Sequence, residues 1–389
     1  MCRTSKRRCS GRTWTRACRR LRKAMTLPEY QSDIYDRLNA EFRRFNAELA
    51  RQYRVAMVDI RREIEELYSR VLAGVTPEQY YSTAVKYQRL SKLQELVMDA
   101  YRRAAAAAGR DIRNASQSAF VNSYFENQYA LQLAVAEAQG ISVAFVGLPE
   151  KIVEAAVMGT PTVFRELRAR AYARWAANPE AYRPRPNTLT DLLLRNRTRE
   201  LAAVRDAVTQ ALIQGRSVDQ ATRMLDRQVA IGRNNAQRIL RTETHRSAVM
   251  GQYAASSSAK HDGANIRRQI ISVLDDRTRL QSAIVDTQFE DEQGYFRYPG
   301  GVPVLIPGNS GYPRWDINDR EVVVDSVVGF PVEQRRVAQP QLVNGRPVLR
   351  NGQPVFRGST TWSFTNFQSW AEEVGLTRNR YGELVAQSR

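Results

Sequence analysis

The stretch from Pro28 to Gln139 carries an almost continuous helical pattern, which restricts the possible folds more than any other feature of the sequence. Within it, Ile34, Leu38 and Phe42 recur near helical spacing, while charged residues occupy the other side. Amphipathic helices of this kind must cover their apolar faces with a partner. The pattern therefore predicts a helical hairpin or bundle, or docking of the helices on the surface of a ring-shaped assembly.

Glycine and capping residues divide this helical region. Ala73-Gly74-Val75 predicts a break, after which Thr76 and Gln79 fit the two ends of a capping box. A second long helix should follow, with an interruption near Gly109. Residues 140–146 fit either a short strand or a loop.

More helices are expected between residues 149 and 263. A break is predicted at residues 159–161, and the proline-rich residues 183–187 indicate a linker or elbow. Helix-start signals then follow at Thr188 or Thr190, and at the capping-box pair Ser217 and Gln220. The helix that begins at Ser217 should end near Val229, and a separate helix should run from about residue 234 to residue 259.

The sequence changes character after Gly263. Three β-like runs appear, separated by glycine and proline: residues 266–274, 302–306 and 322–328. A short tandem repeat, NGRPVLR followed by NGQPVFR, occupies residues 344–357, and its Asn-Gly steps favour hairpin turns. Residues 362–385 have the pattern of one or two amphipathic helices.

These patterns predict an α+β protein with four segments. They are a basic leader (residues 1–27), a long-helix region (28–186), a central helix-plus-small-β domain (187–330), and a C-terminal arm with the hairpin repeat and an amphipathic helix (331–389). Residues 1–24 hold ten Lys/Arg and no acid, and the leader contains all three cysteines. It could be a disordered arm for nucleic acid, a processed segment, or an extension created by too early a start codon, with Met25 as the true start.

The formal net charge of +19 points to polyanionic partners, with nucleic acid first and an anionic membrane surface second. A basic helical stretch with interleaved aromatic residues is the candidate DNA-contact face: Arg165, Arg168, Arg170 and Arg174. Contact of such a face with phosphates would be independent of base sequence and sensitive to salt. The alternative is an ordinary solvated helix face. The sequence has no run of apolar residues long enough for a conventional transmembrane span.

Charged and polar motifs cluster in the central domain. RTETHRSA (residues 241–248) falls in a predicted helix, LDDRTR (274–279) follows a predicted strand, and WDINDRE (315–321) comes later. We expect Arg241 and Glu243 to pair with Asp275 or Asp276 and with Arg277, because an arginine fork binds a carboxylate bidentately. Such a network would hold the helix against the β domain.

This set of motifs resembles the phage Mu F-type head-morphogenesis proteins, the minor head proteins of tailed phages. The resemblance covers roughly residues 215–328. It identifies the following residues as a structural clasp of the family motif: Arg241, Thr242, Glu243, Asp275, Asp276, Arg277, Trp315, Asp316 and Arg320.

The sequence departs from the family pattern at four positions. Ser282 stands where a histidine is expected and Thr287 where a glycine is expected, while Asp319 and Glu321 replace two cysteines. Two carboxylates without histidine or cysteine would not select zinc. We therefore expect no metal and no cofactor.

The resemblance implies a non-enzymatic protein. Such proteins act in prohead assembly and in DNA packaging or delivery, and they dock on the portal protein and the inner capsid or scaffold. The expected location is inside the virion near the portal vertex, with the host cytoplasm as the site of assembly, and non-specific contact with viral double-stranded DNA is expected.

Two other classes of function stay open. One is a free, non-specific nucleic-acid-binding protein. The other is a toxin-like or hydrolytic enzyme fused to a Mu F-type domain, although residues 331–389 are too few for a catalytic domain. The sequence contains only His245 and His261, and it lacks HExxH, G-x-S-x-G and Walker A motifs.

Overall fold

The computed structural model describes residues 27–169, 172, 174–175, 178–183, 185–328, 330, 332, 334–344, 346–351, 353–363, 365–378 and 384–386. The basic leader up to residue 26, and with it the cysteines and the alternative start at Met25, lies outside the described residues.

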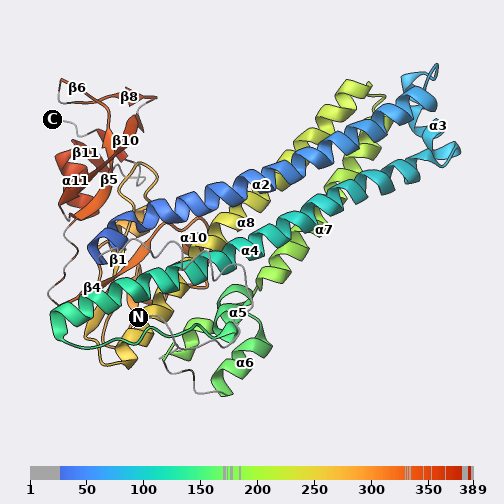
Figure 1. Cartoon of the computed structure of the whole chain (residues 1–389). Helices are drawn as coiled ribbons and strands as arrows, with labels where there is room; N and C mark the ends of the chain where they lie inside the picture. The colour runs from blue at the N-terminus through green and yellow to red at the C-terminus, as the bar shows by residue number, and fades with distance from the viewer. Residues whose placement is uncertain are drawn as a thin grey trace.

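Four long helices in the described part of the chain lie side by side as an elongated bundle (Figure 1): α2 (Leu27–Arg70), α4 (Arg89–Gln139), α7 (Leu189–Ile213) and α8 (Val218–His261). At 1.5 Å per residue, the 51 residues of α4 extend over about 76 Å. One end of the bundle carries a short 3-10 helix, η1 (Pro77–Gln79), and the short helix α3 (Tyr80–Lys86). The other end lies among the strands.

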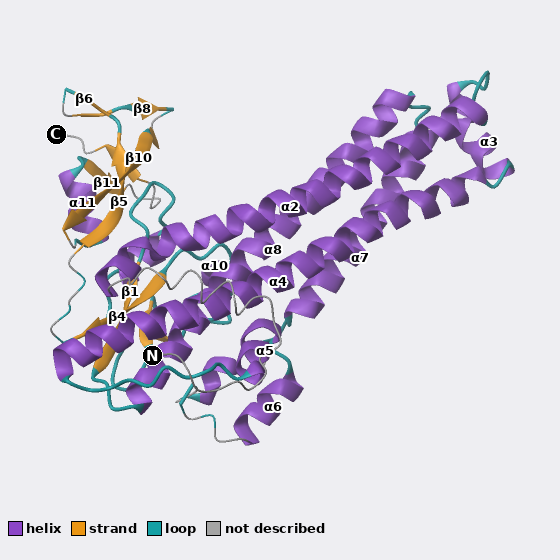
Figure 2. Ribbon diagram, viewed as in Figure 1, coloured by secondary structure: helices purple, strands orange, loops and turns teal. Residues whose placement is uncertain are grey.

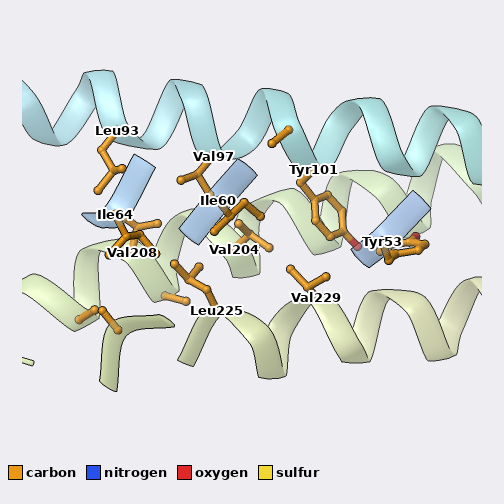
Figure 3. Close-up of a cluster of buried hydrophobic side chains, with 14 of the residues drawn as sticks. Tyr53, Ile60, Ile64, Leu93, Val97, Tyr101, Val204, Val208, Leu225 and Val229 are labelled. Carbon is orange, nitrogen blue, oxygen red and sulfur yellow. The ribbon is translucent and has the colours of Figure 1, made fainter. Parts of the chain in front are cut away.

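The bundle is held together by one elongated apolar core to which all four helices contribute (Figure 3). The labelled side chains are Tyr53, Ile60 and Ile64 from α2, Leu93, Val97 and Tyr101 from α4, Val204 and Val208 from α7, and Leu225 and Val229 from α8. These residues come from both sides of the predicted boundary at residue 186. The predicted long-helix region and central domain therefore share a core in the bundle instead of forming separate units.

Two predicted helix breaks are wrong, and glycine is involved in both. Helix α4 runs through Gly109 without interruption, and α8 is continuous through residues 229–234. Gly232 faces the Tyr101 ring so closely that a Cβ atom there would lie 1.9 Å from the phenol oxygen. Glycine at this position allows close packing against α4 and does not end the helix.

Most of the predicted helix starts and the break at residues 159–161 are confirmed. Thr188 with Asp191, and Ser217 with Gln220, form complete capping boxes at the starts of α7 and α8. Thr76 occupies the N-cap of η1, but its side chain makes no capping hydrogen bond. The break separates α5 (Glu150–Met158) from α6 (Pro161–Ala169), a 3-10 turn η2 (Pro179–Tyr182) follows, and residues 140–146 form a loop.

The β structure gathers at one end of the molecule (Figure 2). Strand β1 (Ile266–Ile271) pairs antiparallel with β4 (Val322–Val327), so that Ile266 lies opposite Val327. Between them the chain forms short elements: α9 (Leu280–Val285), β2 (Phe296–Tyr298), β3 (Val302–Val304) and α10 (Pro313–Asp316). The buried half of α8 lies beside this β structure. The predicted α+β class is confirmed.

The C-terminal arm forms a second small layer. Strands β5 (Gln334–Pro340) and β10 (Phe356–Ser363) pair antiparallel. The predicted hairpin repeat is confirmed, because Asn344 and Asn351 both have φ of 52° in the turns between paired strands. The strands of the two hairpins are β6 (Leu342–Val343) with β7 (Arg346–Pro347), and β8 (Leu349–Arg350) with β9 (Gln353–Pro354).

The tail contains the predicted amphipathic helix, although it is short. Helix α11 (Phe367–Glu373) buries Phe367 and Trp370, and the paired strands β11 (Leu376–Arg378) and β12 (Leu384–Ala386) follow it. Among all the described residues, no helix is both long enough and apolar enough to cross a membrane.

Candidate functional site

The second half of α8 is buried on every side although many of its side chains are polar. Residues 242–259 are all buried, including the Thr-Glu-Thr-His-Arg-Ser sequence of residues 242–247. A buried polar or charged group is stable only when it is hydrogen-bonded or paired. The partners of these side chains therefore define the candidate site.

Glu243 lies at the centre of a buried charge cluster. Its carboxylate accepts hydrogen bonds from Arg185 Nη1 at 2.8 Å and from Arg246 Nη1 at 2.5 Å. Arg246 also donates from Nε to the Gly308 carbonyl at 2.6 Å, and Arg185 donates to the Val157 carbonyl at 3.0 Å. Burial raises the pKa of Glu243, while the charge of Arg185 opposes this shift. The cluster ties α8 to the end of α5 and to the loop after β3.

A second, separate ion pair joins Asp275 to Arg320. Arg320 donates from Nη1 to Asp275 Oδ1 at 2.7 Å and from Nη2 to Oδ2, which is the bidentate geometry of a strong pair. The backbone amide of Arg277 donates to the same carboxylate at 2.9 Å. Burial opposes ionisation, but Arg320 holds the pKa of Asp275 below its usual value. This pair connects the end of β1 to the segment before β4.

The predicted pairing of Glu243 with Arg277 is therefore wrong. Glu243 pairs with arginines outside LDDRTR, and Arg241 lies with its guanidinium 4.5 Å from the centre of the Phe42 ring on α2. Asp276 and Arg277 are exposed. The WDINDRE block contacts the helix directly, since the Asn318 amide donates to Thr242 Oγ1 at 3.2 Å.

Trp315 and Asp316, the other members of the predicted clasp, organise the loop around α10. Asp316 accepts hydrogen bonds from the backbone amides of Ser310 at 2.8 Å and Gly311 at 2.9 Å. The Trp315 ring is buried, with its centre 5.2 Å from that of Tyr298. Both residues shape the loop that places the Gly308 carbonyl beside α8.

Three residues that replace the histidine and the two cysteines of the resembled family pattern lie close together: Ser282, Asp319 and Glu321. Asp319 and Glu321 are buried, and Ser282 lies beside Glu321, to which the Tyr298 hydroxyl donates a hydrogen bond. Burial and the neighbouring charge of Glu321 raise the pKa of Asp319 well above its usual value. Within the described residues, no group of three or more His, Cys, Asp or Glu side chains is arranged to hold a metal ion.

His245 completes this polar cluster from the helix side. Burial lowers its pKa to about 4, and the backbone of Glu321 counteracts part of that effect. His245 Nδ1 and Asp319 Oδ2 face the same small space, because both lie within 3.5 Å of the point where a side chain on Gly308 would begin. A glycine at this position therefore keeps room between the imidazole and the carboxyl group.

The motif residues line one cavity of about 360 Å³, a volume in the range of small-ligand pockets. Its walls come from α2, α8, the end of β1, the segment before β4, and strands β5 and β10. Motif side chains in the wall are Arg241, Thr244, His245, Asp275, Arg277, Asp319 and Arg320. Three sequence motifs separated by up to about 80 residues therefore converge on a single space.

Sequence reasoning missed three contributors to this region. Arg185 lies in the proline-rich linker, and nothing local in that segment indicates a buried partner on α8. Arg335, in the C-terminal arm, forms a buried bidentate pair with Asp286 at 3.0 and 3.1 Å. Phe42 on α2 adds an aromatic wall. The one available signal was Asp286, the acidic residue directly before Thr287, because a carboxylate that becomes buried requires a cation.

The predicted DNA-contact face is only partly available to a ligand. Arg165 and Arg168 are exposed on α6. Arg174, in contrast, forms an ion pair with Asp262 at 2.6 Å and is largely covered. Arg170 lies outside the described residues. Of the four arginines, two are therefore free to face solvent in the described structure.

Comparison with known proteins assigns this chain to no family. No family model, no curated protein and no solved structure matches the chain.

Proposed function

We propose that this chain is a Mu F-type minor head protein of a tailed phage. In this role it acts without enzymatic activity in prohead assembly and in DNA packaging or delivery. It docks on the portal protein and on the inner capsid or scaffold, inside the virion near the portal vertex, after assembly in the host cytoplasm. Contact with viral double-stranded DNA is non-specific.

The observation that carries this proposal is the backbone at Thr287. The family pattern has glycine at this position, and Thr287 adopts φ of 67°, in the left-handed region that glycine enters most easily. A β-branched residue is rarely found there. The turn thus retains a shape suited to the family's glycine although the residue has changed, which supports the correspondence of the motif positions.

The arrangement of charges supports a structural role for the motif blocks. Glu243 and Asp275 each hold buried or half-buried arginines in fixed geometry, and Asp286 holds Arg335. The pairs Glu243–Arg185, Asp275–Arg320 and Asp286–Arg335 each join segments distant in sequence. These residues thereby fix the relative positions of α8, the β structure and the C-terminal arm, which suits a protein that must present a defined shape to a large assembly.

Purification with the portal protein tests the proposal. The full chain should be produced together with the portal protein of the same phage, and the complex isolated at low and at high salt. We expect the two proteins to remain together at high salt, because docking through shape and apolar contacts resists screening. A chain that separates from the portal under both conditions would contradict the proposal. Terminase and portal genes immediately upstream would support the assignment independently.

A free nucleic-acid-binding protein is the second candidate, and the net charge of +19 favours it. Binding to duplex DNA that weakens steeply with salt, without portal association, is the expected result for that function. Arg165→Gln and Arg168→Gln should then reduce the salt dependence by about one phosphate contact each, whereas Asp276→Ala should leave it unchanged.

A further inference from the structure

The distal tip of the bundle presents apolar side chains to solvent. We use this name for residues 80–92 together with Ile213 at the end of α7, which packs against α3. Figure 1 shows α3 at the end of the bundle that lies farthest from the strands. The tip is remote from the cavity and from the clasp residues, and neither explains its composition.

Four large side chains at the tip are exposed. Tyr87 is 58% exposed, Ile213 51%, Val85 47% and Tyr81 38%. Tyr81 and Val85 are one helical turn apart on α3, so their exposed side chains are neighbours on the helix surface. Scattered exposed apolar residues are common, but a group of this size at one end of a helical arm indicates a contact surface.

The charges of the tip are all of one sign. Residues 79–94 contain Lys86, Arg89 and Lys92 but no aspartate or glutamate. Lys86 Nζ lies 5.5 Å from the centre of the Tyr87 ring, so an ammonium group accompanies an exposed aromatic side chain. Glu78 and Glu95 lie just outside this segment, and Glu95 forms a long, exposed ion pair with Lys92 at 3.9 Å that a phosphate group can replace. The tip therefore combines apolar, aromatic and cationic groups.

The local backbone holds these groups outward. Gln88 adopts φ of 55° at the N-cap of α4, a conformation that costs a non-glycine residue about 1 kcal/mol or more. Residues 85–89 are all exposed, so burial within the chain does not compensate this cost. Val85 and Tyr87, just before this turn residue, are both exposed to solvent.

We propose that the distal tip binds the surface of an anionic lipid bilayer. Lys86, Arg89 and Lys92 would contact phosphate headgroups, while the tyrosines and aliphatic side chains would lie at the boundary between headgroups and acyl chains. Phosphate contacts alone would suit DNA, but Val85 and Ile213 gain nothing from a nucleic-acid backbone. The end of a protruding arm also suits a deformable surface better than a shaped protein groove. The proposal does not depend on portal docking.

Vesicle binding by the full chain tests this proposal. Vesicles of phosphatidylcholine alone and vesicles containing phosphatidylglycerol should be sedimented with the protein at physiological ionic strength. We expect binding only to the vesicles with phosphatidylglycerol. Hydrogen exchange of residues 80–92 should slow when these vesicles are present, which locates the contact at the tip.

Two tip variants separate the charge and apolar contributions. Lys86→Gln, Arg89→Gln and Lys92→Gln together should weaken binding about 100-fold, from about 1 kcal/mol for each cation near the surface. Val85→Ser with Tyr87→Ser should weaken it about tenfold through lost apolar burial. These side chains are exposed, so both variants should keep the wild-type helical content and melting temperature.

A matched control comes from the other end of α7. Leu194 is 51% exposed there and is flanked by the exposed Arg195 and Arg199. The variant Leu194→Ser, Arg195→Gln, Arg199→Gln should bind vesicles like the wild type. The proposal would be overturned if the control lost as much vesicle binding as the tip variants, or if both tip variants bound vesicles like the wild type. So would tip variants that lose DNA binding or portal association while keeping their affinity for vesicles.

Discussion

Replacing Gly251 by alanine tests the crossing of α8 over α4, the contact on which the buried half of α8 depends. A Cβ atom at this position would lie 2.2 Å from the Phe120 carbonyl oxygen and 3.0 Å from its carbonyl carbon. Both are backbone atoms and cannot rotate away, so the two helices must separate. Overpacking of this kind costs about 1–3 kcal/mol, and a backbone clash lies at the upper end. The gain in helix propensity, about 1 kcal/mol, offsets only part of it.

We therefore expect Gly251→Ala to lower the free energy of unfolding by about 2 kcal/mol. Urea denaturation followed by far-ultraviolet circular dichroism measures this directly, and an unchanged slope would show that the unfolded state is unaffected. The melting temperature should fall by several degrees.

Gly109→Ala on α4 is the matched control. Its added Cβ would meet only Leu193 Cδ1 at 3.6 Å, an ordinary contact. This substitution should raise the free energy of unfolding by about 0.5–1 kcal/mol, since alanine replaces glycine inside a helix. The two variants should thus shift stability in opposite directions. A Gly251→Ala protein as stable as the wild type would refute the close crossing of α4 and α8.

Three further predictions concern the region around α8. Glu243→Ala should cost about 3–5 kcal/mol in urea denaturation because it leaves two arginines buried without a carboxylate, whereas Asp276→Ala on the surface should change little. Thr287→Gly should add about 1 kcal/mol by relieving a left-handed backbone, and a less stable variant would contradict the strained turn. His245 has a folded pKa of about 4 against 6.5 for an unperturbed histidine, so the unfolded chain takes up its proton first. Stability should therefore fall as the pH decreases from about 6.5 towards 4, by up to about 3 kcal/mol for this group alone. The carboxyls of Asp319 and Glu321 have raised pKa values in the folded protein, so they change stability in the opposite direction. The stability that these two protonated groups contribute at low pH is lost as the pH rises. Subtracting the free energy of unfolding of His245→Gln from that of the wild type at each pH isolates the effect of the histidine. A difference that does not change with pH would exclude a buried neutral imidazole.

Local signals in the sequence determined which elements could be predicted. Ser217 and Gln220 form their capping box within four residues, and Asn344 and Asn351 enter the left-handed region within their own turns. The physical cause of each feature is contained in a short segment. Such features were predicted correctly because no distant partner decides them.

Three of the errors have the opposite property. Glycine inside a helical pattern predicts a break, yet at Gly232 the absent side chain makes room for Tyr101, more than 100 residues earlier in the chain. Glu243 was expected to pair within the β domain, but its partner Arg185 approaches from the linker. Arg174 was expected on a free face and is bound to Asp262. Each outcome depends on which segments lie together in the folded chain, and spacing along the sequence does not contain that information.

The continuity of α8 has a consequence for the whole molecule. One helix contributes Leu225 to the bundle core, Tyr253 to the core beside the β structure and Ala259 to a third apolar cluster. At 1.5 Å per residue its 44 residues span about 66 Å. Separate helices joined near residue 232 would have allowed the bundle to swing relative to the strands. Because the helix is unbroken and Gly232 is packed against α4, the distance between the distal tip and the clasp residues is set by the fold. If one partner binds the distal tip while another binds near the clasp residues, the two binding surfaces must therefore lie apart by the fixed distance between these two parts of the fold.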